Sequence, residues 1–164
     1  MLMLAFAAAL LQPVDSPALE VRRDPITDRV SAFAIVRSPE GRLAIGCDPE
    51  QFRGVRVLVH SSRAWFARER FVSRARSFTF RFDRARPTSS RWATERRTAW
   101  PTSSRVTRGF IQRARTAHQV VVRTTDMEGR RFDLSFDLTG ARPLINEALG
   151  LCTGAFVPSA VPRR

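Results

Sequence analysis

The alternation of apolar and polar residues is clearest in the segment RRFDLSFDL, residues 130–138. Every second residue from Phe132 to Leu138 is apolar, and the residues between them are polar. A period of two with one apolar face is typical of a half-buried antiparallel strand. The preceding segment, 119–125, carries consecutive valines that favour a strand, and residues 126–129 have the length and polarity of a hairpin loop. This part of the chain therefore predicts a β-hairpin.

The pattern changes to helical spacing after Gly140. Apolar residues recur there every three or four positions up to Cys152, and Pro143 lies near the start, where its missing N–H costs little. We expect a closing helix that ends at Cys152. The residues after it, 153–164, are expected to form a flexible tail.

The first half of the chain contains four further strand-like segments. They cover residues 29–37, 42–47, 55–60 and 77–83, and the turn 38–41 joins the first two as a hairpin. In the fourth, Phe78, Phe80 and Phe82 are expected to face inward. Residues 104–117 read as an amphipathic helix that a serine at 103 or 104 can cap.

The segment 84–104 differs in composition, because it is rich in Ser, Thr, Pro and Arg and repeats PTSSR loosely. We expect one short strand near Trp92 and Trp100, between solvated loops. Strands dominate the whole pattern and helices are few. The expected fold is mainly β: a single domain over 19–152, built as an antiparallel β-sandwich or curled sheet with one or two flanking helices.

The N-terminal run MLMLAFAAALLQ is too short to span a membrane and has the length of a signal-peptide core. Small residues at 16–18 predict a signal peptide over 1–18 with cleavage after Ala18. The run lacks a preceding Lys or Arg, so a buried N-terminal helix is the alternative. Export would place the mature protein, without a transmembrane span, in the periplasm or outside a Gram-negative cell.

Net charge is +13, and all 28 basic residues are Arg. Such a bias is typical of a GC-rich genome, so the charge alone is weak evidence for a nucleic-acid partner. It still draws the protein toward anionic surfaces in a salt-dependent way. It also disfavours inhibition of a cationic lysozyme, which the protein would repel.

The chain has two cysteines, Cys47 at a strand end and Cys152 at a helix end. An even count in an exported chain favours a disulfide. Closing a loop of about 100 residues would stabilise the fold by about 4–5 kcal/mol in the entropic account. Two buried free thiols in a cytosolic protein are the alternative.

No catalytic pattern is found in the sequence. His60 and His118 have no acidic or thiol partners at metal-ligand spacing, and Asp133 and Asp137 are expected to be solvated. The chain has neither a GxSxG turn nor a glycine-rich phosphate loop. We therefore expect a protein that is not an enzyme and needs no cofactor or metal.

The strongest binding candidate is an arginine stripe on the 104–117 helix: Arg105, Arg108 and Arg115. It could meet anions together with the arginines before the fourth strand, namely Arg63, Arg68, Arg70, Arg74 and Arg76. In the periplasm those anions would be lipid phosphates, lipopolysaccharide or acidic wall polymers. In the cytosol they would be nucleic acid, with Trp65 and Phe66 stacking on bases. A solvated, functionless arginine face is the third interpretation.

The order of several short motifs resembles small exported β-sandwich proteins of the VasI/TagO type, which are associated with type VI secretion gene clusters. The motifs are DPITD (24–28), LAIGC (43–47), FRFD (80–83) followed by Trp92, Phe110 in a helix, VVVR (120–123), FDLTG (136–140) and Cys152.

The resemblance implies a periplasmic, non-enzymatic accessory protein, with an envelope protein or anionic envelope polymer as its partner. The sequence leads us to expect a monomer, and a cytosolic arginine-rich nucleic-acid-binding module is the alternative. The segment 84–104 departs from the family pattern.

Overall fold

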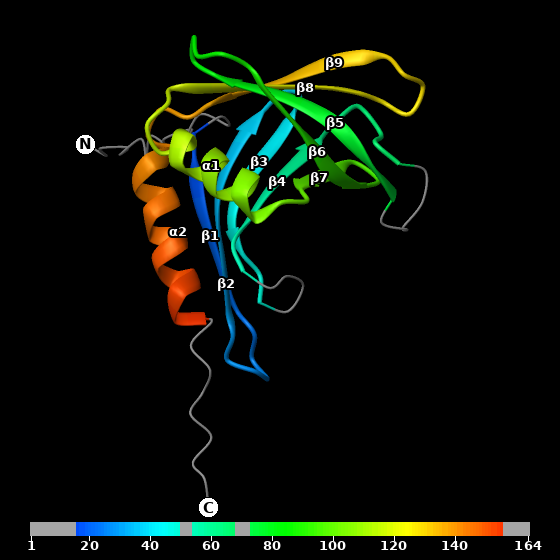
Figure 1. Cartoon of the computed structure of the whole chain (residues 1–164). Helices are drawn as coiled ribbons and strands as arrows, with labels where there is room; N and C mark the ends of the chain where they lie inside the picture. Colours follow the sequence, from blue (N-terminus) through cyan, green and yellow to red (C-terminus); the bar gives the residue numbers. More distant parts are fainter. Residues whose placement is uncertain (1–15, 50–53, 68–72, 156–164) are drawn as a thin grey trace, which may run out of the picture.

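The computed structural model describes residues 16–49, 54–67 and 73–155, which form nine antiparallel strands in one sheet and two helices. The mainly β prediction is confirmed, in its curled-sheet form (Figure 1). The elements are β1 (Ala18–Arg23), β2 (Val30–Ser38), β3 (Gly41–Cys47), β4 (Arg56–Ser61), β5 (Ser73–Phe82), β6 (Thr88–Glu95), β7 (Thr98–Pro101), α1 (Ser104–Ala114), β8 (Gln119–Thr125), β9 (Arg131–Asp137) and α2 (Ala141–Ala155).

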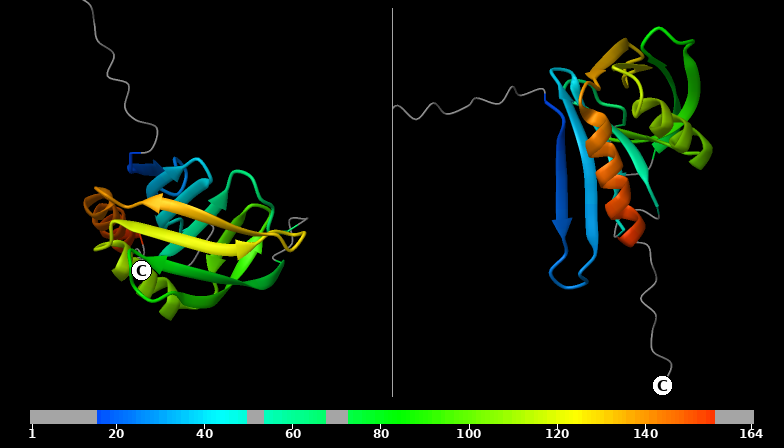
Figure 2. Two further views of the ribbon diagram at one scale, coloured as in Figure 1. Left: turned by 90° about the horizontal axis from the view of Figure 1, so that it is seen from above. Right: turned by 90° about the vertical axis from the view of Figure 1, so that its left-hand side faces the viewer.

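The strand order across the sheet is β1-β2-β3-β4-β7-β6-β5-β8-β9. The sheet curls without closing, so that β5, β8 and β9 cross above the β1–β4 half (Figure 2). β9 packs against β2 and β3, although no ladder joins them. The curl therefore gives the sheet one enclosed face, which holds the core, and one open face.

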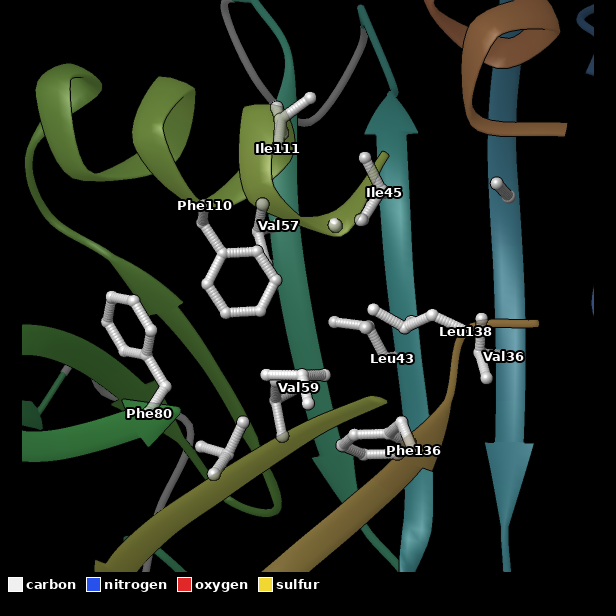
Figure 3. Close-up of a cluster of buried hydrophobic side chains, with 14 of the residues drawn as sticks. Val36, Leu43, Ile45, Val57, Val59, Phe80, Phe110, Ile111, Phe136 and Leu138 are labelled. Atoms are coloured by element: carbon white, nitrogen blue, oxygen red, sulfur yellow. The ribbon is translucent and has the colours of Figure 1, made fainter. Parts of the chain in front are cut away.

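Strand register sets which residues face the core. Val36 lies opposite Leu43, and Leu43 lies opposite Val59, so these side chains share the enclosed face. All three are buried at 2% exposure or less. Figure 3 shows this aliphatic layer with Phe136 and Leu138 packed over it. The alternation in the sequence is thus explained by one buried sheet face.

An aromatic cluster fills the other end of the core. Phe80 and Phe82 of β5 point inward as predicted, and their ring centroids lie 5.2 and 4.9 Å from that of Phe110 in α1. Trp92 of β6 stacks on Phe78 at 4.9 Å. These rings, each 3% exposed or less, fix α1 across this end of the curled sheet.

α2 packs on the enclosed side of β2 and β3. Its buried face consists of Ala141, Ile145, Ala148 and Cys152, at the predicted helical spacing. The strand residues beneath it include the small side chains Ala32 and Ala34, which let the helix approach the sheet closely. The helix begins just after Gly140, whose φ of +77° is a conformation that suits glycine.

Three features differ from the sequence-based expectations. β1 was not predicted; it pairs with β2 from Ala18 to Arg23, and the predicted cleavage point after Ala18 falls on its first residue. The segment 84–104 holds two strands rather than one, because Glu95 pairs with Thr98 across a two-residue turn. Ser103 occupies the N-cap position of α1, but its side chain makes no capping hydrogen bond.

The predicted signal peptide lies mostly, and the predicted tail partly, outside the described residues. α2 continues beyond Cys152 to Ala155, which takes the first part of the expected tail.

Candidate functional site

The two cysteines form the predicted disulfide. Cys47, the last residue of β3, and Cys152 of α2 are joined with their Cα atoms 5.8 Å apart. Both are buried, at 0% and 1% exposure. The bond fastens the closing helix to the N-terminal part of the sheet.

The predicted arginine stripe lies on the solvent side of α1. Arg105, Arg108 and Arg115 are all exposed, while Phe110, Ile111 and other residues of the opposite side are buried. Five hollows on the described surface are lined by other residues.

The arginines expected before β5 do not form one loop cluster. Arg76 lies within β5, where its Nη1 donates to the backbone oxygen of Asp126 at 2.8 Å. Arg74 also lies in β5, and Arg68 and Arg70 lie outside the described residues. Phe66 is fully buried and cannot stack on a base, so that part of the nucleic-acid hypothesis is wrong.

The acidic candidates have structural partners. Asp133 accepts two hydrogen bonds from Arg123, at 2.7 and 2.6 Å, and this contact holds the pKa of the carboxyl below its ordinary value. Asp137 accepts from the backbone N–H of Thr139 at 2.8 Å, which likewise lowers its pKa. Both carboxylates therefore stay ionised, and each has a structural partner of its own.

The most site-like feature is a groove on the open face of the sheet. A hollow of about 600 Å³ extends over β4, β7 and the β6–β7 turn, and a second of about 330 Å³ adjoins it through Arg42 and His60. We call the two together the outer groove. Its volume falls in the range of ordinary ligand sites.

Strand register brings the cations of the outer groove together. Arg37 pairs with Arg42, Arg42 with His60, and His60 with Thr98, so these residues form one row across β2, β3, β4 and β7. Arg37 is neutralised by Glu20 at 2.6 Å. Among the described residues, no hydrogen bond or ion pair engages the Arg42 guanidinium. Arg37 and Arg42 carry like charges at directly opposite positions of two strands, an arrangement that destabilises a sheet.

The loop before β5 supplies the opposite wall. Trp65 is 43% exposed there, and the next residue, Phe66, is fully buried. The Arg97 guanidinium lies over the Trp65 ring, 4.7 Å from its centroid, and Nη1 of Arg97 donates to the Ser62 oxygen at 3.0 Å. Leu58 and Trp100 give the groove an apolar floor.

The β6–β7 turn positions this wall. The backbone N–H groups of Phe66 and Ala67 both donate to the Arg96 oxygen, at 2.6 and 3.1 Å. Arg96 itself has a φ of +49°, a left-handed conformation that glycine or asparagine adopts more easily. Strain of this kind is often found at functional sites.

The pKa of His60 reflects the burial and the charges in the outer groove. Its Nδ1 lies 3.2 Å from the Thr98 hydroxyl. Partial burial lowers the pKa of His60 from 6.5, and the charges of Arg42 and Arg97 lower it further. His60 is therefore neutral at pH 7 in a region of positive potential.

The sequence pointed to His60 and Trp65 individually but missed Arg42 and Arg97. The only signal was that Arg42, Arg56 and His60 fall at positions that alternate with the inward-facing apolar residues of 42–47 and 55–60. Which of these polar residues meet depends on register and on the β6–β7 hairpin, which the sequence did not predict.

Within residues 16–49, 54–67 and 73–155, we find no cluster of three or more His, Cys, Asp or Glu side chains that could hold a metal ion. Over the same ranges, the helices fall short of the length and apolar character needed to cross a membrane. Comparison with protein-family models, curated proteins and solved structures finds no match for this chain.

Proposed function

We propose that this chain is an exported, non-enzymatic envelope protein that binds an anionic envelope polymer. The observation that carries the proposal is the buried Cys47–Cys152 disulfide. Disulfides persist in the periplasm and outside the cell, whereas cytosolic thiols are kept reduced. The apolar run 1–12 supports the same compartment.

The net charge of +13 supports an anionic partner. Long-range attraction of this kind raises the local concentration of a polyanion and its association rate. The outer groove supports a binding role, since it combines cationic side chains with aromatic ones. An accessory role beside a type VI secretion system follows from the sequence resemblance and belongs to the same proposal.

A binding rather than catalytic role is favoured by the state of the candidate groups. Asp133 is held by Arg123, and Asp137 is bonded to Thr139. His60 contacts only Thr98 among the hydrogen-bonding groups of the described chain. A general base needs a reacting proton within reach and an orienting partner, and this arrangement offers no such pair.

The test is the intact mass of the protein from an osmotic-shock fraction of its host, recovered without reductant. We expect a species that begins near the start of β1 and is lighter by two hydrogens than the reduced chain. A full-length, reduced protein in the cytosol would overturn the export proposal and favour the nucleic-acid module. A Cys47→Ala variant controls the mass difference, because it cannot form the bond.

A further inference from the structure

We propose that the outer groove binds the carboxylate-bearing sugar units of an acidic polysaccharide. The carboxylate would lie against Arg42, His60 and Arg97, and the sugar ring against Trp65. The inference deepens the proposed function and rests on it for the choice of polymer, because acidic glycans are typical of the cell envelope.

The first support is that two arginines of the groove have N–H donors without hydrogen-bond partners among the described residues. Among the described residues, nothing engages the Arg42 guanidinium, and the Nε of Arg97 is buried without a hydrogen-bond partner there. Guanidinium groups bind carboxylates through short, charge-assisted hydrogen bonds. An arriving carboxylate would also balance the positive charges of Arg42 and Arg97.

The second support is the aromatic wall. Trp65 lines the groove and keeps 43% of its surface exposed. The Arg97 guanidinium lies over one face of its ring, 4.7 Å from the centroid, and a sugar would pack on the other face. The C–H face of a pyranose is apolar and weakly positive, so it packs on the negative face of an indole.

The third support is a set of polar groups that suit sugar hydroxyls. Glu95 lines the groove, where its carboxylate can accept hydrogen bonds from hydroxyl groups. The Thr98 hydroxyl offers a further polar contact.

The binding experiment uses the purified, oxidised protein and tri-galacturonic acid as the probe. Maltotriose is the neutral control, and a single-stranded oligonucleotide represents the alternative macromolecule. We expect titration calorimetry to detect the acidic trisaccharide and to give weaker binding for the other two. Absence of binding by tri-galacturonate, or tighter binding of the oligonucleotide, would overturn the proposal.

Matched variants locate the site. Arg42→Gln should weaken binding tenfold or more, since a hydrogen bond to a charged group is worth about 1.5–3 kcal/mol. Arg142→Gln removes the same charge at an exposed position of α2, which packs on the enclosed side of the sheet, and should change affinity less than twofold. Equal losses in the two variants would indicate diffuse attraction and contradict a site in the groove. Trp65→Ala should weaken binding while Trp65→Phe retains most of it.

The pKa of His60 distinguishes a direct contact with the bound carboxylate from an indirect structural effect of a substitution. A bound carboxylate should raise the pKa of His60, because an opposite charge nearby favours the protonated ring. By linkage, affinity should increase as pH falls from 8 to 5, and His60→Asn should reduce that dependence. The charged groups around His60 are Arg37, Arg42, Glu95, Arg96 and Arg97. An unchanged His60 pKa at saturating trisaccharide would place the ligand elsewhere.

The outcomes separate this inference from the proposed function. If the protein is exported with its disulfide but does not bind the trisaccharide, the groove site is refuted and the proposed compartment is retained. Trisaccharide binding by a protein that stays in the cytosol would refute export and leave the groove as a carboxylate site.

Discussion

Cys47 and Cys152 are linked although 105 residues separate them, and the Cys152 sulfur lies 3.9 Å from the backbone oxygen of Ala32. Ala32 is the cross-strand neighbour of Cys47. The disulfide therefore joins the last helix to the second and third strands at one point. It fastens α2 to the N-terminal part of the sheet.

Removing this bond should lower stability substantially. We expect Cys47→Ala/Cys152→Ala to lose about 2–5 kcal/mol of unfolding free energy, because the unfolded chain regains the entropy that the long loop restricted. Urea denaturation followed by circular dichroism measures the loss. The wild-type protein treated with dithiothreitol should shift by a similar amount. A variant as stable as the oxidised protein would show that α2 docks without the bond.

Much of this core was predictable from side-chain period. Phe78, Phe80 and Phe82 face inward, and the helix after Gly140 buries the residues at its predicted spacing. These segments each have a single apolar face, and a single buried face is what the period reports.

The outer groove, in contrast, was not predictable from side-chain period. Arg42, His60 and Thr98 are brought together by the register of β3, β4 and β7, and register is a tertiary property. The β6–β7 hairpin turns at Arg96, which lacks the glycine or asparagine signal of a tight turn. β1 carries exposed polar residues on much of its length, so its pattern gave no apolar face to read.

Gly46 should be intolerant of any side chain. A Cβ at this position would overlap the Ala32 oxygen and lie 2.7 Å from the Cα of Phe33, both in the neighbouring strand. We expect Gly46→Ala to cost about 1–3 kcal/mol, as overpacking does. Gly109→Ala is the control, because space is open around it in α1 and alanine should stabilise the helix by about 0.5–1 kcal/mol. Thermal unfolding compares them, and a neutral Gly46→Ala would mean that β2 and β3 can separate locally.

Phe110 should account for the docking of α1. Its ring is fully buried among Phe80, Phe82 and Trp92, with centroid distances of 5.2, 4.9 and 6.0 Å. Phe110→Ala should lose about 3–5 kcal/mol, since a large cavity would remain among rings that cannot collapse into it. Ile26→Ala, at a residue 90% exposed, is the matched control and should be nearly neutral. Chemical denaturation gives both values, and a loss near that of the control would contradict this packing role.

His60 should make stability depend on pH in a defined direction. Its pKa is lowered by burial first and by Arg42 and Arg97 next, so the folded state disfavours the protonated ring relative to the unfolded chain. The unfolded chain then binds more protons near its pKa of 6.5, and the contribution of neutral His60 is complete above that value. It is lost as pH falls from about 6.5 through the lower pKa of the folded state. The difference in unfolding free energy between wild type and His60→Asn, measured from pH 8 to pH 5, should follow this course.

The cause of that shift can be tested separately, because the chain contains only His60 and His118. Proton NMR titration of the two imidazoles gives their pKa values, and a His118→Gln variant assigns the signals. Arg42→Gln should raise the pKa of His60 part of the way toward 6.5, since burial and Arg97 remain. Arg115→Gln, at the C-cap of α1 and not among the charges that lower this pKa, should leave it unchanged. If both variants shift His60 equally, the potential at the groove comes from the net charge of the whole protein and not from the row of residues across its strands.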